Sequence, residues 1–213
     1  PGHAAARSRR TSSARAERRL KRVATIVGAR PQFIKAAALS WAFRQRTGMV
    51  EDLIHTGQHY DPGLSDVFFR ELEIPAPRHH LEIGSGSHGA QTGEMLKQIE
   101  RVLEADRPDL VLVYGDTNST LAGALAAAKL HIPVAHVEAG LRSFNRAMPE
   151  EINRVVTDHL STWHFCPTRT AVEHLRTEGL TTGVHLVGDV MFDVALKTAE
   201  RSRTLSRFVG GAL

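Results

Sequence analysis

Short apolar runs alternate with longer segments of helical pattern from Val23 onward. The runs predict strands over residues 23–28, 50–57, 109–115, 132–140, 163–168 and 184–188. The segments between them predict helices over residues 31–48, 65–72, 88–106, 118–131, 149–160, 169–179 and 189–202. Strands that alternate with helices form a parallel sheet covered by helices on both faces. We therefore expect an α/β fold built on a parallel sheet.

Local signals indicate the ends of several helices. Pro31 suits the first turn of its helix because it has no amide proton, and Gly48 is expected to end that segment. Asn118 or Ser119 is expected to cap the alanine-rich helix. Pro149 is expected in the first turn of a later helix, and the acids after it would interact favourably with the helix dipole.

Acidic residues lie at the ends of two successive apolar runs. Asp116 follows the run over residues 109–115, and Glu138 lies near the end of the next one. Ligands of parallel sheets bind beside the carboxyl ends of the strands, so both carboxylates are expected to face one crevice. Capping of the following helix is the alternative role for each acid. His136 lies two residues before Glu138 and is expected on the same face of its strand.

Basic residues and further acids follow other strand ends. Arg30 comes after a glycine at the start of the first helix, an arrangement that suits a phosphate, although the fingerprint G-x-G-x-x-G is absent. Lys35 lies about one helical turn further, and its alternative role is that of a solvated surface lysine. Glu150 begins a later helix, after a loop that carries Arg142 and Arg146. Proton-transferring acids and phosphate-binding cations would suit a phosphorylated or nucleotide-linked substrate.

Cysteine and histidine usage points away from metal sites and disulfides. The 12 histidines are scattered without an H-E-x-x-H motif or a paired cysteine–histidine array, so we expect no metal and no cofactor. His79 and His80 are expected on a polar loop. Cys166 is the only cysteine, which fits a core position and a reducing cytoplasm. No apolar run approaches the ~18 residues of a membrane span.

The positive net charge comes from the N-terminal segment. Residues 1–22 hold eight of the 27 Lys and Arg residues and only one acid, Glu17. The other residues hold 19 basic and 22 acidic side chains, so the body of the protein is mildly acidic. We expect a solvated, disordered tail. Contact with nucleic acid or anionic lipid, or a role as a transit peptide, are the alternatives.

Six motifs occur in order between about Val23 and about Ala199. They are GARPQFIKAA, HTGQHYD, VYGDTNSTLAGALAAAKLHIPVAHVEAGLRS, MPEEINRVVTDHLS, FCPT and VGDVMFD. Together they resemble the non-hydrolysing UDP-N-acetylglucosamine 2-epimerases. The resemblance implies the N-terminal half of a GT-B-like architecture, in which the substrate lies between two Rossmann-like domains. It also implies interconversion of UDP-GlcNAc and UDP-ManNAc, through elimination of UDP to a 2-acetamidoglucal and re-addition of UDP.

The resemblance assigns roles to individual residues. It implies that the acid–base residues are Asp116, Glu138 and Glu150. It implies that Arg30 and Lys35 help to bind the nucleotide sugar, with assistance from Arg142. Gln58 and His59 match family positions and are expected at an allosteric or cleft position.

Two departures from the family pattern bear on the substrate and the domains. Many members read RPE where this chain has Pro31 and Gln32, and relatives of similar sequence act on modified UDP-sugars such as UDP-2,3-diacetamido-uronic acids. The family's second domain, with its catalytic histidine, does not follow VGDVMFD. We therefore expect a truncated form with a tail over 1–22, an epimerase N-terminal domain over 23–188, and a helix with a truncated end over 189–213.

Other functions remain open on the sequence alone. A truncated epimerase would need a separate C-terminal domain for activity, and the family implies a homodimer. The alternatives are a non-catalytic module that binds a UDP-sugar or a partner protein, a related glycosyltransferase, and a protein that binds nucleic acid through its tail. The acidic body disfavours the last of these, so no specific nucleic-acid partner is expected.

Overall fold

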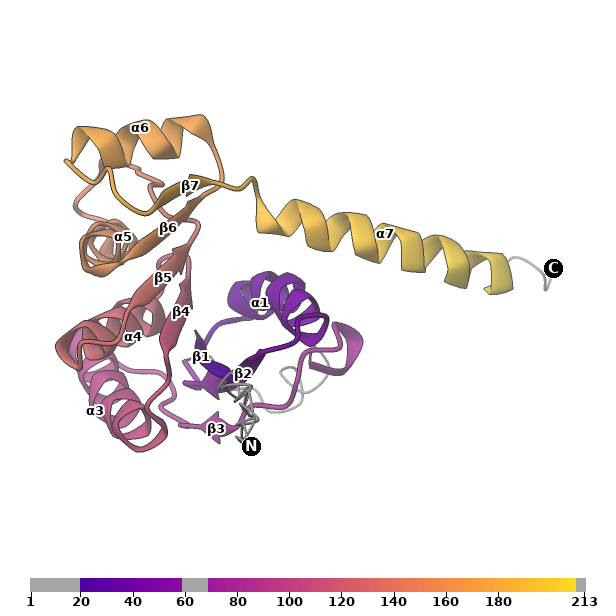
Figure 1. Ribbon diagram of the computed structural model, residues 1–213, viewed down its shortest axis with the longest axis horizontal. Helices are drawn as coiled ribbons and strands as arrows, with labels where there is room; N and C mark the ends of the chain where they lie inside the picture. The colour runs from indigo at the N-terminus through magenta and orange to yellow at the C-terminus, as the bar shows by residue number, and fades with distance from the viewer. Residues whose placement is uncertain (1–19, 59–68, 210–213) are drawn as a thin grey trace, which may run out of the picture.

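The computed structural model describes residues 20–58 and 69–209, in which seven strands form one parallel sheet (Figure 1). The strands are β1 (Lys21–Val27), β2 (Met49–His55), β3 (His79–His80), β4 (Leu110–Tyr114), β5 (Val134–Val137), β6 (Trp163–Cys166) and β7 (Val184–Leu186). Their order in the sheet is β3-β2-β1-β4-β5-β6-β7. All neighbouring pairs are parallel, as the alternating pattern predicts.

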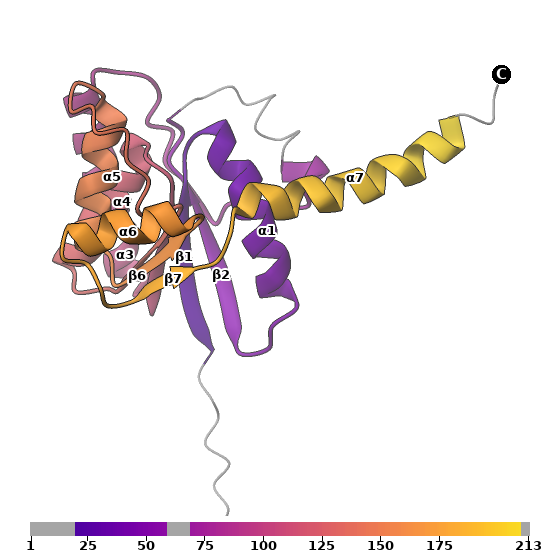
Figure 2. The same cartoon turned by 90° about the horizontal axis from the view of Figure 1, so that it is seen from above.

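Helices connect the strands and cover both faces of the sheet, which confirms the expected fold class. They are α1 (Arg30–Arg44), α3 (His88–Asp106), α4 (Asn118–Lys129), α5 (Pro149–Leu160), α6 (Arg169–Thr177) and α7 (Val190–Val209). Figure 2 shows α1 and α7 on one side of the sheet and α3 to α6 on the other. The core therefore has two layers, one against α1 and one against α3 and α4.

Alternate residues of the central strands enter these two layers. In β4, Leu112 and Tyr114 pack toward α1, whereas Val111 and Val113 pack toward α3 and α4. Both sets are almost wholly buried because helices cover both faces, which explains why β4 reads as a continuous apolar run. Gly123 of α4 allows a close approach, since a Cβ there would lie 2.7 Å from the Ile26 side chain.

The chain reverses its direction of travel across the sheet between β1 and β4. From β1 it moves outward through β2 to β3, and then it returns to build β4 through β7 on the other side. The loops after β1 and β4 consequently leave in opposite directions. In sheets that reverse in this way, ligands bind at the carboxyl edge of the strands. The predicted acids lie at this edge.

Two details differ from the sequence-based predictions, and one further prediction is largely untested. His79 and His80 form β3, paired with Ile54 and His55 of β2, rather than a polar loop. Two residues are too few to produce a recognisable alternation. β1 begins at Lys21, so the end of the predicted tail belongs to the sheet. The predicted helix over 65–72 falls largely outside the described residues.

The last helix extends away from the sheet. Val190 and Val194 of α7 are buried beside α1, and the Lys197 ammonium lies 3.7 Å from the Trp41 ring centroid. Beyond this contact α7 projects from the rest of the structure (Figures 1 and 2). No helix within the described residues is both long and apolar enough to cross a membrane.

Candidate active site

The carboxyl ends of β4 and β5 turn sharply, and each turn carries one predicted acid. Gly115, with φ of 63°, separates β4 from Asp116, while Glu138 directly follows β5 and has φ of 69° itself. Left-handed backbone is uncommon for a residue with a Cβ, and such strain concentrates at functional sites. Hydrogen bonds from the amides of Glu138 and Ala139 to the Phe165 carbonyl hold the second turn.

Lys35 and Glu138 meet at the centre of this edge. Their side chains form an ion pair between α1 and the turn after β5, and each is 15% exposed. Gly115 closes the same space, because a Cβ there would lie 3.3 Å from both Lys35 Nζ and Glu138 Oε2. Lys35 is therefore not a solvated surface lysine. The fold brings a cation, an acid and a bare backbone turn together.

His136 does not share the face of Glu138, contrary to the prediction. The ring of His136 points toward α5, where its Nδ1 lies 2.7 Å from Asp158 Oδ1. The Glu138 carboxylate points to Lys35 of α1, on the opposite side of the sheet. The alternation of strand side chains fails here because β5 ends at Val137 and the positive φ of Glu138 redirects the chain.

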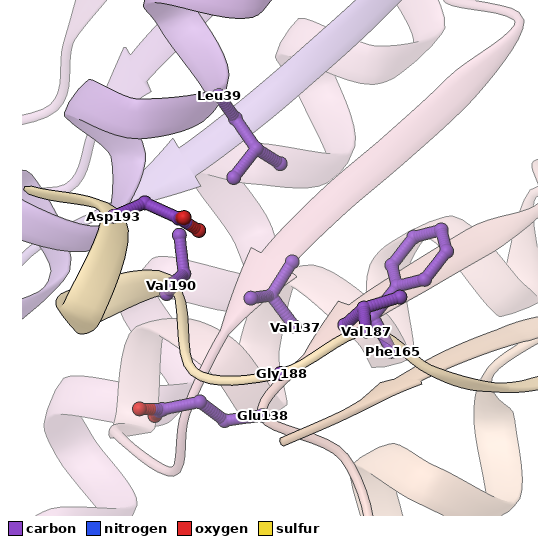
Figure 3. Close-up of a pocket in the computed structure, with 8 residues that line it drawn as sticks. All are labelled: Leu39, Val137, Glu138, Phe165, Val187, Gly188, Val190 and Asp193. Carbon is purple, nitrogen blue, oxygen red and sulfur yellow. The ribbon is translucent and has the colours of Figure 1, made fainter.

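An apolar pocket of about 240 Å³ opens beside Glu138. Figure 3 shows Leu39 of α1, Val137 of β5 and Val190 of α7 gathered around it, with Glu138 at its border. A second carboxylate, that of Asp193, also lines the pocket. The site thus offers apolar contacts next to a paired acid, which is the usual composition of a small-molecule site.

Asp116 is held by a cation from α5 and does not cap α4. The Arg154 guanidinium donates to Asp116 Oδ2 at 2.6 Å, and the Asn153 amide donates to the Asp116 carbonyl at 2.8 Å. Thr117 is the capping residue, since its hydroxyl accepts from the Thr120 amide. The predicted caps, Asn118 and Ser119, lie instead within the helix. Asp116 keeps a side chain that is 31% exposed.

The adjacent acids at the start of α5 have different environments. Glu151 is 2% exposed and accepts hydrogen bonds from the amides of Ser143 and Phe144 and from Arg154. Burial alone would raise the pKa of Glu151, but these donors outweigh it and lower the pKa to about 2. Glu150 is half-buried, and its carboxylate has no hydrogen bond or ion pair with any described residue. The Glu150 carboxylate is therefore available to contact a ligand.

The loop after β1 is occupied by a glutamine rather than left open for an anion. Gln32 Oε1 accepts from the amides of Gly28 and Ala29 at 2.8 and 3.1 Å, and its Nε2 donates to the Tyr114 carbonyl at 2.9 Å. Pro31 has no amide proton to offer. The amides of Gly28 and Ala29 are therefore already occupied and do not offer hydrogen bonds to the phosphate that the sequence pattern suggests here. Arg30, the first residue of α1, has an exposed side chain at this edge.

Arg142 lies beneath the site instead of in it. Its side chain is 1% exposed and donates at 2.7 Å to Asp158 and, through two nitrogens, to Glu178. Both sides of the guanidinium are thus engaged by carboxylates of α5 and of the end of α6. This placement favours support of the loop after β5 over contact with a substrate.

The two residues expected at an allosteric or cleft position differ in what the structure describes. Gln58 Oε1 accepts from the amide and the hydroxyl of Ser119, at 3.2 and 2.7 Å, and so joins the loop after β2 to the first turn of α4. His59 lies outside the described residues. No group of three His, Cys, Asp or Glu suited to a metal ion occurs within the described ranges.

The buried polar face of α5 was missed by the sequence analysis. Glu151, Arg154 and Asp158 recur at i, i+3 and i+7, the spacing of one helical face, and all three engage the site or its turns. The apolar residues Ile152 and Val156 are instead 44% and 36% exposed. The three-and-four spacing of these charged residues is the signal of this face in the sequence. Apolar periodicity, which predicts the helices, does not reveal it.

Comparison with known proteins identifies the family. The UDP-N-acetylglucosamine 2-epimerase family profile matches residues 41–209. The chain belongs to this family. A Methanococcus maripaludis protein described as a UDP-N-acetylglucosamine 2-epimerase homolog is 61% identical over 183 residues, which are 84% of this chain and 51% of that protein. The UDP-2,3-diacetamido-2,3-dideoxy-D-glucuronate 2-epimerase of Pseudomonas aeruginosa is 54% identical over 184 residues, 85% of this chain and 52% of that enzyme.

Solved structures of 2-epimerases share the fold. The Methanocaldococcus jannaschii UDP-GlcNAc 2-epimerase, crystallised with UDP-GlcNAc and UDP, superposes with a TM-score of 0.82 at 46% identity. The superposition covers 90% of this chain and 54% of that one. The chain thus spans about half the length of the relatives that it matches, which agrees with the N-terminal half of a GT-B-like architecture.

Proposed function

We propose that this chain provides the acid–base half of a UDP-sugar 2-epimerase site, which interconverts UDP-GlcNAc and UDP-ManNAc. The observation that carries the proposal is the meeting of Lys35, Glu138 and Gly115 at the carboxyl edge, beside the turn that carries Asp116. Family membership supplies the reaction type. No cofactor enters this proposal, because acids and an anion-binding cation suffice for the chemistry.

The reaction places specific demands on these side chains. A carboxylate removes the proton from C2 while the C1–O bond to UDP breaks, which leaves a C1–C2 double bond and free UDP. Re-addition of UDP to C1 and delivery of a proton to the opposite face of C2 complete the inversion. Because the C2 proton is weakly acidic, departure of the diphosphate and well-placed acids must assist each other. We assign the proton transfers to Asp116, Glu138 and Glu150.

Cations at the same edge are suited to the leaving group. Lys35 is paired with Glu138 and would be shared between that acid and the substrate diphosphate. Arg30 is exposed at the start of α1, where it would contact the nucleotide. We assign substrate binding to these two residues. Arg142 is assigned to support of the loop after β5, because two carboxylates already engage its guanidinium.

A second UDP-sugar is the alternative candidate for the substrate. The 54% identity to the Pseudomonas aeruginosa enzyme favours a UDP-2,3-diacetamido-uronic acid as the second candidate. Both sugars carry an acetamido group at C2, so the acid–base chemistry would be the same. The two sugars differ at C3 and C6, so groups that surround the sugar, including those of a second domain, would distinguish between them.

The remaining parts of the site are proposed to come from partners. The chain spans about half of its relatives, so we propose that a second domain covers the carboxyl edge and encloses the nucleotide. We also propose a homodimer, supported by the exposed apolar residues Ile152 and Val156 on α5.

The single cysteine, Cys166, is buried and unpaired, which supports a cytoplasmic location.

Proton exchange at C2 tests the proposal. The chain is incubated in deuterium oxide with UDP-GlcNAc or the diacetamido-uronate, alone and with a separately produced second domain of a family member. The C2 proton is followed by NMR. Exchange that is lost in Asp116→Asn supports the proposed chemistry, and the preferred sugar identifies the substrate. Absence of exchange and of UDP-sugar binding under all conditions, with the chain folded, would refute it.

A further inference from the structure

His136 connects two parts of the site without reaching the site itself. It lies in β5 with no exposed surface, and its ring points toward α5. Its Nε2 lies 2.7 Å from the Gly115 carbonyl oxygen, and its Nδ1 lies 2.7 Å from Asp158 Oδ1. A carbonyl oxygen only accepts hydrogen bonds, so Nε2 carries a proton and donates it. His136 therefore holds the peptide that joins Gly115 to Asp116.

The second partner of His136 is an ionised carboxylate. Asp158 has no exposed surface and also accepts from the Arg142 guanidinium at 2.7 Å and the Gly140 amide at 3.1 Å. Burial alone would raise the pKa of Asp158, but His136 and Arg142 outweigh burial and lower it. Asp158 thus ties the His136 ring to the Arg142 guanidinium and to the Gly140 amide.

One carboxylate consequently fixes both acid-bearing turns. Asp158 holds the turn of Glu138 directly, through the Gly140 amide. It holds the turn of Asp116 indirectly, through His136 and the Gly115 carbonyl. Gly115 in turn lies against the Lys35–Glu138 pair. The separation of the two acids is therefore set from below the sheet edge, by groups that no substrate would touch.

We infer that His136 and Asp158 are positioning residues, which keep the Gly115–Asp116 turn in register with Glu138 for proton transfer at the two faces of one carbon. The inference rests on the proposed function for its consequence, but its geometry is independent of any substrate. A misplacement of about 1 Å at such a site costs on the order of a hundredfold in rate. Loss of the link to Gly115 should therefore lower kcat more than it raises KM.

Two substitutions of His136 separate its two contacts. In His136→Gln the amide nitrogen takes the place of Nε2 and still donates to Gly115. In His136→Asn the amide nitrogen takes the place of Nδ1, so the contact with Asp158 remains and the contact with Gly115 is lost. His164→Gln is the matched control. His164 is the register partner of His136 in β6 and equally buried, but its Nε2 faces only the Asp158 backbone carbonyl, at 2.8 Å.

Amide hydrogen exchange of the full chain, followed by NMR, is the test. The Gly115 amide donates to the Val137 carbonyl at 3.0 Å, so its protection reports on the turn. We expect exchange at Gly115 to rise on the order of tenfold in His136→Asn, and to stay near wild type in His136→Gln and His164→Gln. Exchange at Gly140 should stay near wild type in all three. Wild-type His136 should show a ring N–H signal from Nε2, the nitrogen that donates to Gly115.

The outcomes distinguish this inference from the proposed function. Equal exchange at Gly115 in the two His136 variants, or a wild-type ring without an Nε2–H signal, would overturn the positioning role. Where C2 exchange is measurable, His136→Asn should reduce kcat far more than His136→Gln does, and equal losses would also overturn it. Lack of C2 exchange in the wild type would count against the epimerase proposal alone, because the amide measurement needs no substrate.

Discussion

Glu150 and Glu151 are adjacent acids for which the structure predicts different effects of the same substitution on stability. In Glu151→Gln, a side chain that accepts from two amides and a guanidinium loses its charge and presents an amide group to those donors. The pKa of Glu151 lies at about 2, against a reference of 4.5. At 1.36 kcal/mol for each pKa unit, this shift corresponds to roughly 3 kcal/mol of folding free energy at neutral pH.

We therefore expect Glu151→Gln to lower the free energy of unfolding by roughly 2–3 kcal/mol at pH 7. Because the folded-state pKa is depressed, this contribution is fully present above pH 4.5 and is lost as the pH falls toward 2. The difference between wild type and variant should shrink over that window. Urea titrations at pH 7, 4 and 3, followed through the fluorescence of buried Trp41, measure it.

Glu150→Gln is the matched control, with the same change one residue earlier. Its carboxylate contacts no described residue through a hydrogen bond or ion pair, so the free energy of unfolding should stay within about 0.5 kcal/mol of wild type. If Glu150 transfers a proton, this variant should instead lose C2 exchange. Equal destabilisation by the two substitutions, or a Glu151 effect that persists unchanged at pH 3, would refute the reasoning.

Three further predictions concern buried groups. Burial lowers the pKa of His55 to about 4, so the free energy of unfolding of the wild type should fall by roughly 3 kcal/mol between pH 6.5 and 4. In His55→Phe the dependence of Tm on pH should be flatter over this range. An unchanged slope would contradict this prediction. Burial raises the pKa of the Cys166 thiol to about 11, so iodoacetamide at pH 8 should label it only after unfolding, and rapid labelling of folded protein would count against this. Gly140→Ala should prevent folding or cost more than about 3 kcal/mol in thermal unfolding, because its Cβ would lie 2.3 Å from the Ala171 carbonyl oxygen. Gly179 has a similar φ and no atom near the position of a Cβ, so Gly179→Ala should cost only about 1 kcal/mol. Similar effects of both substitutions would argue against the clash.

The outline of the fold was predictable because it depends on local patterns. Each apolar run is short enough to be a strand, and each helical segment is long enough to cross back over the sheet. The connection rules of parallel sheets then place the carboxyl ends at one edge, which brings Asp116 and Glu138 to the same side. The two-residue strand β3 lay below the length at which a pattern exists.

The roles of buried polar residues were not predictable in this way. Gln32 reads as an ordinary helix residue, yet its amide joins the loop after β1 to the end of β4. Arg142 reads as a phosphate-binding cation after a strand, yet it is 1% exposed between two carboxylates. Hydrogen-bond partners distant in sequence decide these roles, and apolar periodicity carries no information about them.

The sequence by itself determined the class of fold, the edge at which chemistry can occur, and the acids that reach it. Only the tertiary structure decided that Glu151 supports a loop while the Glu150 carboxylate contacts no described residue through a hydrogen bond or ion pair, and that His136 turns from Glu138 toward Asp158. The reason is physical. Strand and helix formation follow from backbone geometry and local burial, whereas the state of a polar side chain depends on which donors, acceptors and charges the fold places within hydrogen-bonding distance of it.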